Sequence, residues 1–414
     1  MNLQTDKIFS EKLDNNDPLS DLKEKFIFPL SNPIYFCGHS LGLQPKSTSK
    51  FVTNELESWA NLGVEGHMSG KDPWLDYHML LTQSMSEIVG SKASETVVMN
   101  SLTTNLHLLM ISFFRPNKKK YKIIIDTPVF PSDKYAVQSQ LKLHNLDPEK
   151  DLIEINTLRN NKCISKEEML DSIESNIDNV AMILLSGVNY YTGQLYDIKS
   201  IAKLAQNHGC IIGLDLAHAA GNVELHLNKW EIDFASWCGY KYLNGGPGAP
   251  SGVFIHEKHH NREINRLEGW WGHDKNTRFN PPEVFSPINS AEAWQLSNPP
   301  ILSMAALRGS LELFSDIGIK SLREKSEKLT GYLEYLVKSL DSKKINIVTP
   351  SQSDERGSQL SLIIDSEEDY INKIFSKNNI IIDVRKPNVI RAAPCASYNS
   401  FSDVYNFVEI LKQI

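Results

Sequence analysis

Short, continuously apolar runs alternate with amphipathic segments between about residue 97 and residue 241. Runs that are apolar throughout are typical of strands buried on both faces, and the amphipathic segments repeat their hydrophobic residues at helical spacing. The predicted strands are 97–99, 122–126, 153–158, 180–185, 210–215 and 234–238, and the predicted helices are 106–114, one that starts near Asp133, 166–175 and 198–208. This alternation predicts an α/β fold with a mainly parallel sheet wrapped by helices.

The chain on either side of this region follows a less regular pattern. Before it, 1–30 is mostly polar, and we predict a short strand at 34–38, a helix opened by Pro45 and a helix at 74–89. Beyond it, the pattern predicts helices at 301–314, 321–340, 367–376 and 402–413 and strands at 345–348, 359–364, 380–383 and 389–392. We expect an N-terminal segment (1–50) that packs with the small domain, a large domain (51–300) and a small α+β domain (301–414).

The composition is ordinary for a globular chain, with 41% hydrophobic and 22% charged residues among 414. A net charge of −7 argues against non-specific binding to nucleic acid. The five cysteines are scattered without a C-x-x-C pair, which fits neither a zinc site nor a disulfide framework and suits a reducing compartment. Residues 1–21 lack a signal-peptide core, and no apolar run reaches the length of a membrane span. We expect a cytoplasmic protein without a metal site, nucleic-acid partner or membrane partner.

Polar residues follow most of the predicted strands. In mainly parallel sheets, ligands bind at the edge where the carboxyl ends of the strands meet. The residues in these positions are Ser101–Thr103, Phe130–Asp133, Ser186, Asp215–His218 and Tyr240–Lys241. We therefore expect these residues to converge on one site, although they are far apart in the chain.

Lys241 is the first candidate for chemistry. It follows the apolar run 234–238 and precedes Asn-Gly-Gly-Pro-Gly at 244–248, which predicts a tight turn. Partial desolvation disfavours the charged form of a lysine, so its free amine becomes available as a nucleophile. A Schiff base with a carbonyl compound or with pyridoxal phosphate (PLP) requires such an amine. The ordinary alternative is a surface lysine beside a turn.

Asp215, at the end of the preceding predicted strand, complements Lys241. In a PLP enzyme the lysine holds the aldehyde carbon, and an acid keeps the pyridine nitrogen protonated so that the ring can act as an electron sink. Phe130 offers an aromatic face on which such a ring can stack. Asp215 could instead bind magnesium, but no second acid at a suitable spacing supports that reading.

Three further groups each have a functional and an ordinary interpretation. The hydroxyl residues at 101–104 stand at a helix N-terminus, where backbone N–H groups bind phosphate, but they could simply be N-caps. Arg391 could clamp a substrate carboxylate by bidentate pairing, or could form a structural salt bridge. His67 lies in a glycine-flanked loop, where a histidine is usually just solvated.

Several stretches between residue 34 and about residue 401 carry a resemblance through their order and spacing. They include Ser-Leu-Gly-Leu-Gln-Pro (40–45), Glu-Gly-His (65–67), Met-Asn-Ser-Leu-Thr-Thr-Asn-Leu-His-Leu-Leu (99–109), Phe-Pro-Ser-Asp (130–133), Ser-Gly-Val-Asn-Tyr-Tyr-Thr-Gly-Gln (186–194), Asp-Leu-Ala-His-Ala-Ala-Gly-Asn-Val (215–223), Trp-Cys-Gly-Tyr-Lys-Tyr-Leu-Asn-Gly-Gly (237–246), Gly-Trp-Trp-Gly-His (269–273) and Leu-Ser-Asn-Pro-Pro-Ile (296–301). In these stretches the chain resembles the kynureninase family, PLP-dependent hydrolases of tryptophan catabolism with the aspartate-aminotransferase-like fold. The resemblance implies a PLP-dependent transferase-like architecture whose large domain has a mainly parallel, seven-stranded sheet.

The resemblance also implies a role for each matching residue. Lys241 would form the Schiff base with PLP, Asp215 would pair with the pyridine nitrogen beside His218, and Phe130 would stack on the ring. The rest of the cofactor cradle would be Leu102, Thr103, Pro131, Ser132, Asp133, Ser186 and Tyr240. Trp270 and Asn298 would reach the site from the partner subunit of a homodimer. The groups facing the substrate would be His67, Ser297 and Asn298 at its aniline end and Arg391 at its carboxylate.

The implied reaction is hydrolytic cleavage of the Cβ–Cγ bond of L-kynurenine, or of 3-hydroxy-L-kynurenine, to anthranilate or 3-hydroxyanthranilate and L-alanine, in tryptophan catabolism and NAD biosynthesis. Lys241, Asp215 and Tyr240 would be the catalytic residues, with Tyr240 assisting proton transfer. One alternative is another class V PLP enzyme, either an aminotransferase or a cysteine desulfurase, for which Cys395 is the candidate loop cysteine. Another alternative is a non-catalytic PLP-binding module. His39 and Trp271 stand where the family usually has Asn and Phe, and both could tune the aryl pocket.

Overall fold

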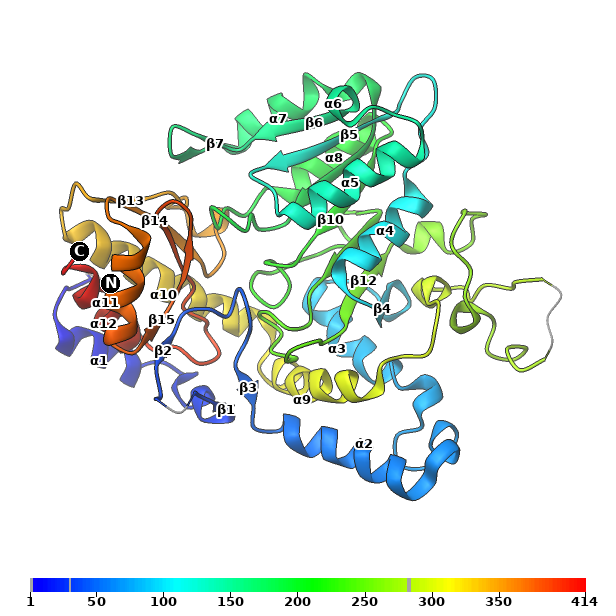
Figure 1. Ribbon diagram of the computed structural model, residues 1–414, viewed down its shortest axis with the longest axis horizontal. Helices are drawn as coiled ribbons and strands as arrows, with labels where there is room; N and C mark the ends of the chain where they lie inside the picture. Colours follow the sequence, from blue (N-terminus) through cyan, green and yellow to red (C-terminus); the bar gives the residue numbers. More distant parts are fainter. Residues whose placement is uncertain (1–2, 30, 281–283) are drawn as a thin grey trace.

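A seven-stranded sheet forms the centre of the larger part of the molecule (Figure 1). The computed structural model describes residues 3–29, 31–280 and 284–414. The sheet has the order β4-β12-β11-β10-β9-β5-β6. Its strands are β4 (Thr96–Met99), β5 (Lys122–Thr127), β6 (Leu152–Asn156), β9 (Val180–Ser186), β10 (Ile211–Asp215), β11 (Phe234–Trp237) and β12 (Ser251–Ile255). The pairings between β11 and β6 are all parallel, and β12 is antiparallel to both of its neighbours, so the predicted mainly parallel sheet is confirmed.

Helices cover both faces of this sheet because alternate strand residues point to opposite sides. Along β5, for example, Ile124 belongs to one buried cluster while Ile123 and Ile125 belong to the other. The helices around the sheet are α2 (Thr48–Leu62), α3 (Met79–Val89), α4 (Leu102–Phe113), α5 (Pro131–Leu143), α6 (Pro148–Asp151), α7 (Lys166–Glu174), α8 (Ile198–Asn207) and α9 (Ile301–Ile317). Each leucine, isoleucine or phenylalanine buried in this way contributes about 1.5–3 kcal/mol. The sheet is therefore a rigid platform for whatever its loops carry.

A smaller four-stranded antiparallel sheet lies at the other end of the molecule (Figure 1). Its order is β13 (Ile345–Ile347), β14 (Leu360–Ile364), β17 (Val389–Ala392) and β16 (Asp383–Arg385), and α10 (Ile319–Ser339), α11 (Glu368–Lys377) and α12 (Phe401–Leu411) accompany it. The N-terminal helix α1 (Lys7–Asn15) packs on α12, and β2 (Ile34–Tyr35) pairs with β15 (Ile380–Ile381). Helix α9 instead packs along α2 and α3. The predicted domain limits stay a prediction.

Element boundaries differ from the predicted ones at several places. Helix α4 begins at Leu102 rather than 106, because Ser101 is its extended N-cap residue and the Ser101 carbonyl already accepts the Asn105 N–H (3.0 Å). Helix α5 begins at Pro131 rather than near Asp133, because proline suits the first helical position. The predicted helix 74–89 is a 3₁₀ turn at Trp74–Asp76 followed by α3. The predicted strand 380–383 is divided between β15 and β16.

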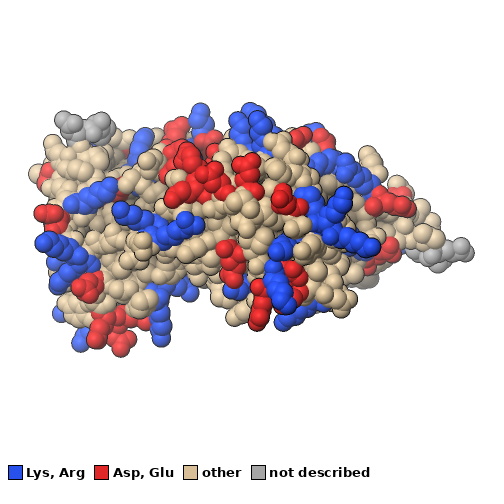
Figure 2. Space-filling view, turned by 90° about the horizontal axis from the view of Figure 1, so that it is seen from above, with Lys and Arg blue, Asp and Glu red and all other residues tan. Residues whose placement is uncertain are grey.

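The remaining described strands are short, and the surface carries both signs of charge. These strands are β1 (Phe26–Ile27), β3 (Gln44–Pro45), β7 (Leu158–Arg159) and β8 (Lys162–Cys163). Basic and acidic side chains are interspersed over the face shown in Figure 2. Within the described ranges, no helix combines the length and the apolar character needed to cross a bilayer.

Candidate active site

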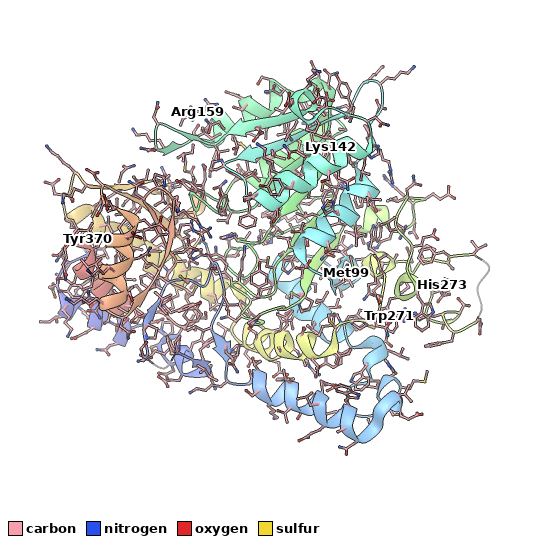
Figure 3. All side chains as sticks on the ribbon, viewed as in Figure 1. Met99, Lys142, Arg159, Trp271, His273 and Tyr370 are labelled. Atoms are coloured by element: carbon pink, nitrogen blue, oxygen red, sulfur yellow. The ribbon has the colours of Figure 1, made fainter. Side chains whose placement is uncertain are left out.

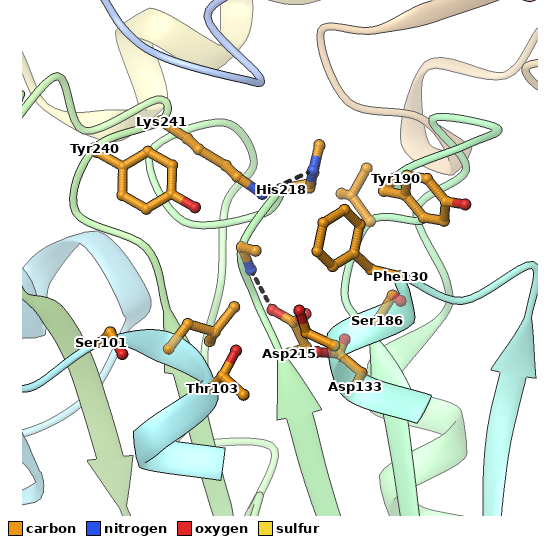
Figure 4. A pocket seen from close by; sticks show the side chains of 14 residues that line it. Ser101, Thr103, Phe130, Asp133, Ser186, Tyr190, Asp215, His218, Tyr240 and Lys241 are labelled. Atoms are coloured by element: carbon orange, nitrogen blue, oxygen red, sulfur yellow. Dashed lines mark hydrogen bonds between the residues drawn. The ribbon is translucent and has the colours of Figure 1, made fainter. Parts of the chain in front are cut away.

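The carboxyl ends of β9, β10 and β11 open onto a cavity of about 150 Å³ (Figure 4). Its walls are the N-termini of α4 and α5 and the loops that follow these three strands. The lining residues are Ser101, Leu102, Thr103, Phe130, Ser132, Asp133, Ser186, Val188, Tyr190, Asp215, Ala217, His218, Tyr240 and Lys241. The predicted convergence of strand-end residues on one site is therefore confirmed.

Lys241 is held by the loop that precedes α2 in the chain. The Gly42 N–H donates to the Tyr240 carbonyl (2.9 Å), and the Asn244 side chain donates to the Leu43 carbonyl (3.0 Å). A Cβ at Gly42 would lie 2.4 Å from the Lys241 carbonyl oxygen, so only glycine allows this approach. The Lys241 Nζ lies 3.1 Å from His218 Nε2 and 5.9 Å from the centre of the Phe130 ring. The amine therefore projects into the cavity from one fixed side.

Two carboxyl groups face Lys241 from the other side of the cavity (Figure 4). Asp215 ends β10, and its Oδ1 accepts the Ala217 N–H at 2.7 Å. Asp133, on the first turn of α5, is buried, and its Oδ1 has no hydrogen-bond partner within the described chain. Burial and the neighbouring Asp215 carboxylate raise the pKa of Asp133 well above its usual range. This end of the cavity can accept a hydrogen-bond donor that carries positive charge.

Burial also keeps two polar rings of the cavity uncharged. Burial and the nearby Lys241 and Arg391 cations hold the pKa of His218 well below its usual range, so the imidazole is neutral and can accept a hydrogen bond from Lys241. Burial, with Cys238 adding to it, raises the pKa of Tyr240, so its hydroxyl stays protonated. The site thus holds a neutral acceptor and a neutral acid beside one amine.

The base of the cavity presents two helix N-termini. Helices α4 and α5 both begin there, with Thr103 and Ser132 in their first turns. Free backbone N–H groups and hydroxyls at helix N-termini bind phosphate. Ser186, which completes this wall, is fixed because its N–H and hydroxyl both donate to the buried Asp126 (3.0 and 3.3 Å).

The residues present fit pyridoxal phosphate. The unpartnered Oδ1 of Asp133 beside Asp215 suits a protonated ring nitrogen, and the Lys241 amine on the opposite side suits an aldehyde carbon. Phe130, which is 40% exposed, presents its ring to the space between them. The N-terminus of α4, with the Thr103 hydroxyl, suits the phosphate, whereas α5 opens with Pro131 and keeps only the Ser132 N–H free of the Phe130 carbonyl. A ring that has a protonated nitrogen and carries an aldehyde and a phosphate therefore matches the donors and acceptors of the cavity.

Arg391 lies beside this cavity rather than in its wall. It stands on β17 with its side chain buried, and its Nη1 donates to the carbonyl of the lining residue Tyr190 at 2.9 Å. Its Nε and Nη2 donate to Asp383 (3.2 and 2.6 Å). Arg391 thus forms a salt bridge with Asp383, which was one of the two interpretations of this residue, and it does so next to the predicted site.

The remaining predicted residues lie elsewhere on this chain. His67, Trp270 and Asn298 line a second cavity of about 300 Å³, together with Trp271. Figure 3 shows Trp271 on the side of the molecule away from Tyr370 of the small domain. Ser297 is exposed beside Asn298. Their predicted roles are not met by the first cavity of a single chain. Pro131 differs from these residues, because it stands at the start of α5 between the lining residues Phe130 and Ser132, and its predicted contact with the cofactor stays a prediction.

Sequence reasoning missed several residues of the site as candidates. Val188 and Tyr190 line the cavity, and Asp383 holds Arg391. Tyr190 could have been found, because it lies in the stretch 186–194 that follows a predicted strand end. Asp383 could not, since its pairing with Arg391 depends on the register of β16 against β17.

Comparisons with known proteins agree with the fold. A family model described as aminotransferase class I and II matches residues 66–236, and one described as kynureninase C-terminal domain matches 322–411. The kynureninase of Myxococcus xanthus is 48% identical over 98% of this chain and 96% of its own length. An apo cysteine desulfurase from Thermococcus onnurineus superposes with a TM-score of 0.77 at 18% identity, covering 95% of this chain and 97% of its own. A C-DES mutant with glycine covalently linked to its PLP cofactor superposes with a TM-score of 0.77 at 15% identity, covering 93% of this chain and 97% of its own.

The fold and the site together define a PLP-dependent enzyme of the aspartate-aminotransferase-like type. The two structural relatives share this fold at low identity, and the curated relative extends the match to sequence over almost the whole length. The chain belongs to the kynureninase family.

Proposed function

We propose that this protein hydrolyses the Cβ–Cγ bond of L-kynurenine, or of 3-hydroxy-L-kynurenine, to yield anthranilate, or its 3-hydroxy form, and L-alanine. The observation that carries the proposal is the placement of Lys241 and Asp215 on opposite sides of one cavity in a chain of the kynureninase family. Water supplies the hydroxyl group of the new carboxylate and the hydrogen that ends on Cβ.

The cofactor is held by groups at each of its ends. Lys241 Nζ would bind the aldehyde carbon, Asp215 would pair with the ring nitrogen, and the N-terminus of α4 would bind the phosphate. Phe130, in the wall of the same cavity, would stack on the ring. When bound, PLP supplies a ring that accepts the electrons released as bonds at Cα and Cβ of the substrate break.

Side chains of the cavity move the protons. With substrate bound, the free Lys241 amine would remove the Cα proton, and neutral His218 would orient that amine through the 3.1 Å contact. Tyr240 keeps its phenolic proton because burial raises its pKa, so it can deliver that proton to Cβ as the carbon–carbon bond breaks. General acid–base catalysis of this kind contributes about 10²–10⁴-fold to a rate.

The substrate's two ends meet different parts of the molecule. Arg391, which donates to the carbonyl of the lining residue Tyr190, would bind the α-carboxylate. The aniline end requires the groups on the second cavity, His67, Ser297 and Asn298. Since these lie away from Lys241 on one chain, the proposal includes a partner subunit that supplies them.

The proposed partner is a second copy of this chain, giving a homodimer with shared active sites. Exposed hydrophobic side chains surround the second cavity, including Val64 (76% exposed), Met68 (63%) and Phe279 (58%). Contiguous apolar surface of this kind marks an interaction site. A two-fold dimer that covers this surface would bring Trp270 and Asn298 of one chain toward the cofactor cavity of the other.

A cysteine desulfurase remains the nearest rival on grounds of fold. That chemistry needs a mobile, reactive cysteine. Cys395 is buried, and burial raises its pKa to about 12, so it is neither mobile nor a ready thiolate.

We also propose that the protein lies in the cytoplasm, because all five cysteines are free.

The test compares purified wild-type protein with Lys241→Ala in the presence of PLP. Wild type is expected to show the Schiff-base absorbance and to release fluorescent anthranilate from L-kynurenine, whereas Lys241→Ala is expected to lose both. Lys229→Ala, at an exposed lysine, is the matched control and is expected to keep both. Anthranilate release that survives Lys241→Ala would contradict the assignment.

Two other outcomes would replace the proposed activity. Cofactor uptake without turnover of either substrate would favour a non-catalytic module. Sulfide release from cysteine without anthranilate release would favour the desulfurase. Running 3-hydroxy-L-kynurenine in parallel establishes which substrate is preferred.

A further inference from the structure

We propose that Asp383 is a positioning residue for Arg391, which it locks so that two N–H groups of the guanidinium point to the substrate carboxylate. The proposal rests on the proposed function, in which Arg391 binds that carboxylate. Asp383 itself touches neither the cofactor cavity nor any of its lining side chains by a hydrogen bond within the described chain.

The pairing is built into the small sheet. Asp383 on β16 is the direct cross-strand partner of Arg391 on β17, so both side chains rise from the same face. Arg391 Nε donates to Asp383 Oδ1 at 3.2 Å, and Nη2 donates to Oδ2 at 2.6 Å. This is a two-point contact along one edge of the guanidinium, which fixes its plane as well as its position.

The hydrogen bonds of Arg391 leave two of its donors without a partner within the described chain. A guanidinium has five N–H donors. Asp383 takes one from Nε and one from Nη2, and the Tyr190 carbonyl takes one from Nη1 (2.9 Å). One N–H remains on each terminal nitrogen, and a carboxylate can accept two N–H groups from one guanidinium. Because Arg391 is only 2% exposed, bulk water does not readily satisfy these two donors.

Asp383 is also the negative charge that allows two arginines to lie together. Arg385 Nε and Nη2 lie 2.9 and 3.1 Å from its carboxylate. His39 approaches Oδ2 at 3.9 Å but adds no positive charge, because burial and the arginines hold its pKa well below the usual range. Without Asp383, Arg391 and Arg385 would repel each other, and a buried guanidinium would lose its counter-charge.

A competing role is that Asp383 occludes Arg391 until substrate displaces it. The geometry favours positioning, because Asp383 uses the Nε edge of the guanidinium and leaves a donor on each terminal nitrogen. The two roles predict opposite effects on affinity. Positioning predicts weaker binding of substrate when Asp383 is replaced, and occlusion predicts tighter binding.

The experiment uses PLP-loaded protein and two ligands, L-kynurenine and its decarboxylated analogue, which lacks only the carboxylate. The variants are Asp383→Asn, Arg391→Gln and the double variant. Asp354→Asn removes an exposed ion-paired aspartate elsewhere and is the matched control. Dissociation constants come from the change in cofactor absorbance, and KM and kcat come from anthranilate release.

Asp383→Asn is expected to raise the dissociation constant and KM for L-kynurenine about tenfold, with kcat changed less. It should leave affinity for the decarboxylated analogue within about twofold, which also shows that the variant is folded. Arg391→Gln should weaken L-kynurenine about 30-fold or more, and the double variant should be no weaker than Arg391→Gln alone.

Equal weakening of both ligands by Asp383→Asn, tighter binding of L-kynurenine, or an additive double variant would each overturn the positioning role. Two other results would contradict the proposed function rather than the role of Asp383. If Arg391→Gln weakened both ligands alike, Arg391 would not bind the carboxylate. If wild type bound L-kynurenine without cleaving it, the hydrolase would be wrong while the affinity comparison still decided the role of Asp383.

Discussion

Single side chains at this site take their chemistry from how little water reaches them. Burial keeps His218 and Tyr240 uncharged and raises the pKa of Asp133, while Lys241 stands opposite that carboxyl pair. Each group is ordinary in water, and each becomes specialised because the cavity disfavours an unpaired charge. A substitution that keeps the shape of a side chain but removes its proton-bearing atom therefore tests the role of that side chain in proton transfer without disturbing its packing.

Tyr240→Phe removes the phenolic proton and keeps the ring. We expect kcat for L-kynurenine to fall by about 10²–10³-fold with a smaller change in KM, because the lost group acts as a general acid. Anthranilate fluorescence measures the rate, and the cofactor absorbance band should be unchanged. Tyr191→Phe, at a half-buried tyrosine outside the cavity lining, should leave kcat within about twofold. A Tyr240→Phe enzyme with normal kcat would remove Tyr240 from the proton path.

At the scale of elements, the segment that carries Trp270 and Asn298 has few strands to hold it. A cluster of charged side chains helps to hold this segment in place. Glu292 lies on the 3₁₀ turn Ala291–Trp294. Its carboxylate lies 2.7 Å from Nε2 of His78, the residue before α3, and 2.9 Å from Lys275 Nζ. Burial alone would raise the pKa of Glu292, but hydrogen bonds from His78 and Lys275 lower it to about 2. The cluster thus ties this segment to the helix layer of the large sheet.

Glu292→Gln is expected to destabilise the protein by about 1–3 kcal/mol near neutral pH, since it leaves His78 and Lys275 without their shared anion. The folded pKa of Glu292 is depressed, so its contribution is complete above its ordinary value of 4.5 and is lost as the pH falls toward 2. The difference in thermal unfolding between wild type and Glu292→Gln should therefore shrink on acidification.

The control for this prediction uses the same lysine. Asp76→Asn removes the more exposed carboxylate partner of Lys275, so it should cost less than about 1 kcal/mol and change little with pH. A Glu292→Gln difference that stayed constant from neutral pH to pH values near 2 would show that the cluster contributes through packing rather than charge.

At the scale of the whole molecule, the proposed active site needs two chains. Lys241 lines one cavity, and Trp270 and Asn298 line another on the same subunit. A homodimer of the proposed kind would hold two sites, each built from Lys241 of one chain and Asn298 of the other.

Co-expression of Lys241→Ala with a Trp270→Ala, Asn298→Ala double variant tests this arrangement. Each variant alone should be nearly inactive, whereas hybrid dimers should contain one intact site and one doubly defective site. Random pairing should then restore about a quarter of wild-type anthranilate release. Mixed protein no more active than its components would mean that the two cavities do not combine across a dimer.

The sequence by itself determined the sheet and the edge where the site lies. Continuous apolar runs such as 180–185 and 210–215 are stable in a sheet that is covered on both faces, so their parallel arrangement follows from local pattern. Because strand ends of such a sheet share one edge, the same pattern predicts that Asp215 and Lys241 line one cavity. Motif spacing added the cofactor and the family.

Tertiary structure alone decided the rest. The antiparallel strand β12 was not predicted, and the pairing of Asp383 with Arg391 depends on cross-strand register, which links residues by long-range hydrogen bonding rather than by spacing along the chain. His67 and Asn298 line a different cavity from Lys241, and this separation likewise does not follow from spacing along the chain. Local pattern specifies which faces must be buried, and only packing determines which buried face meets which.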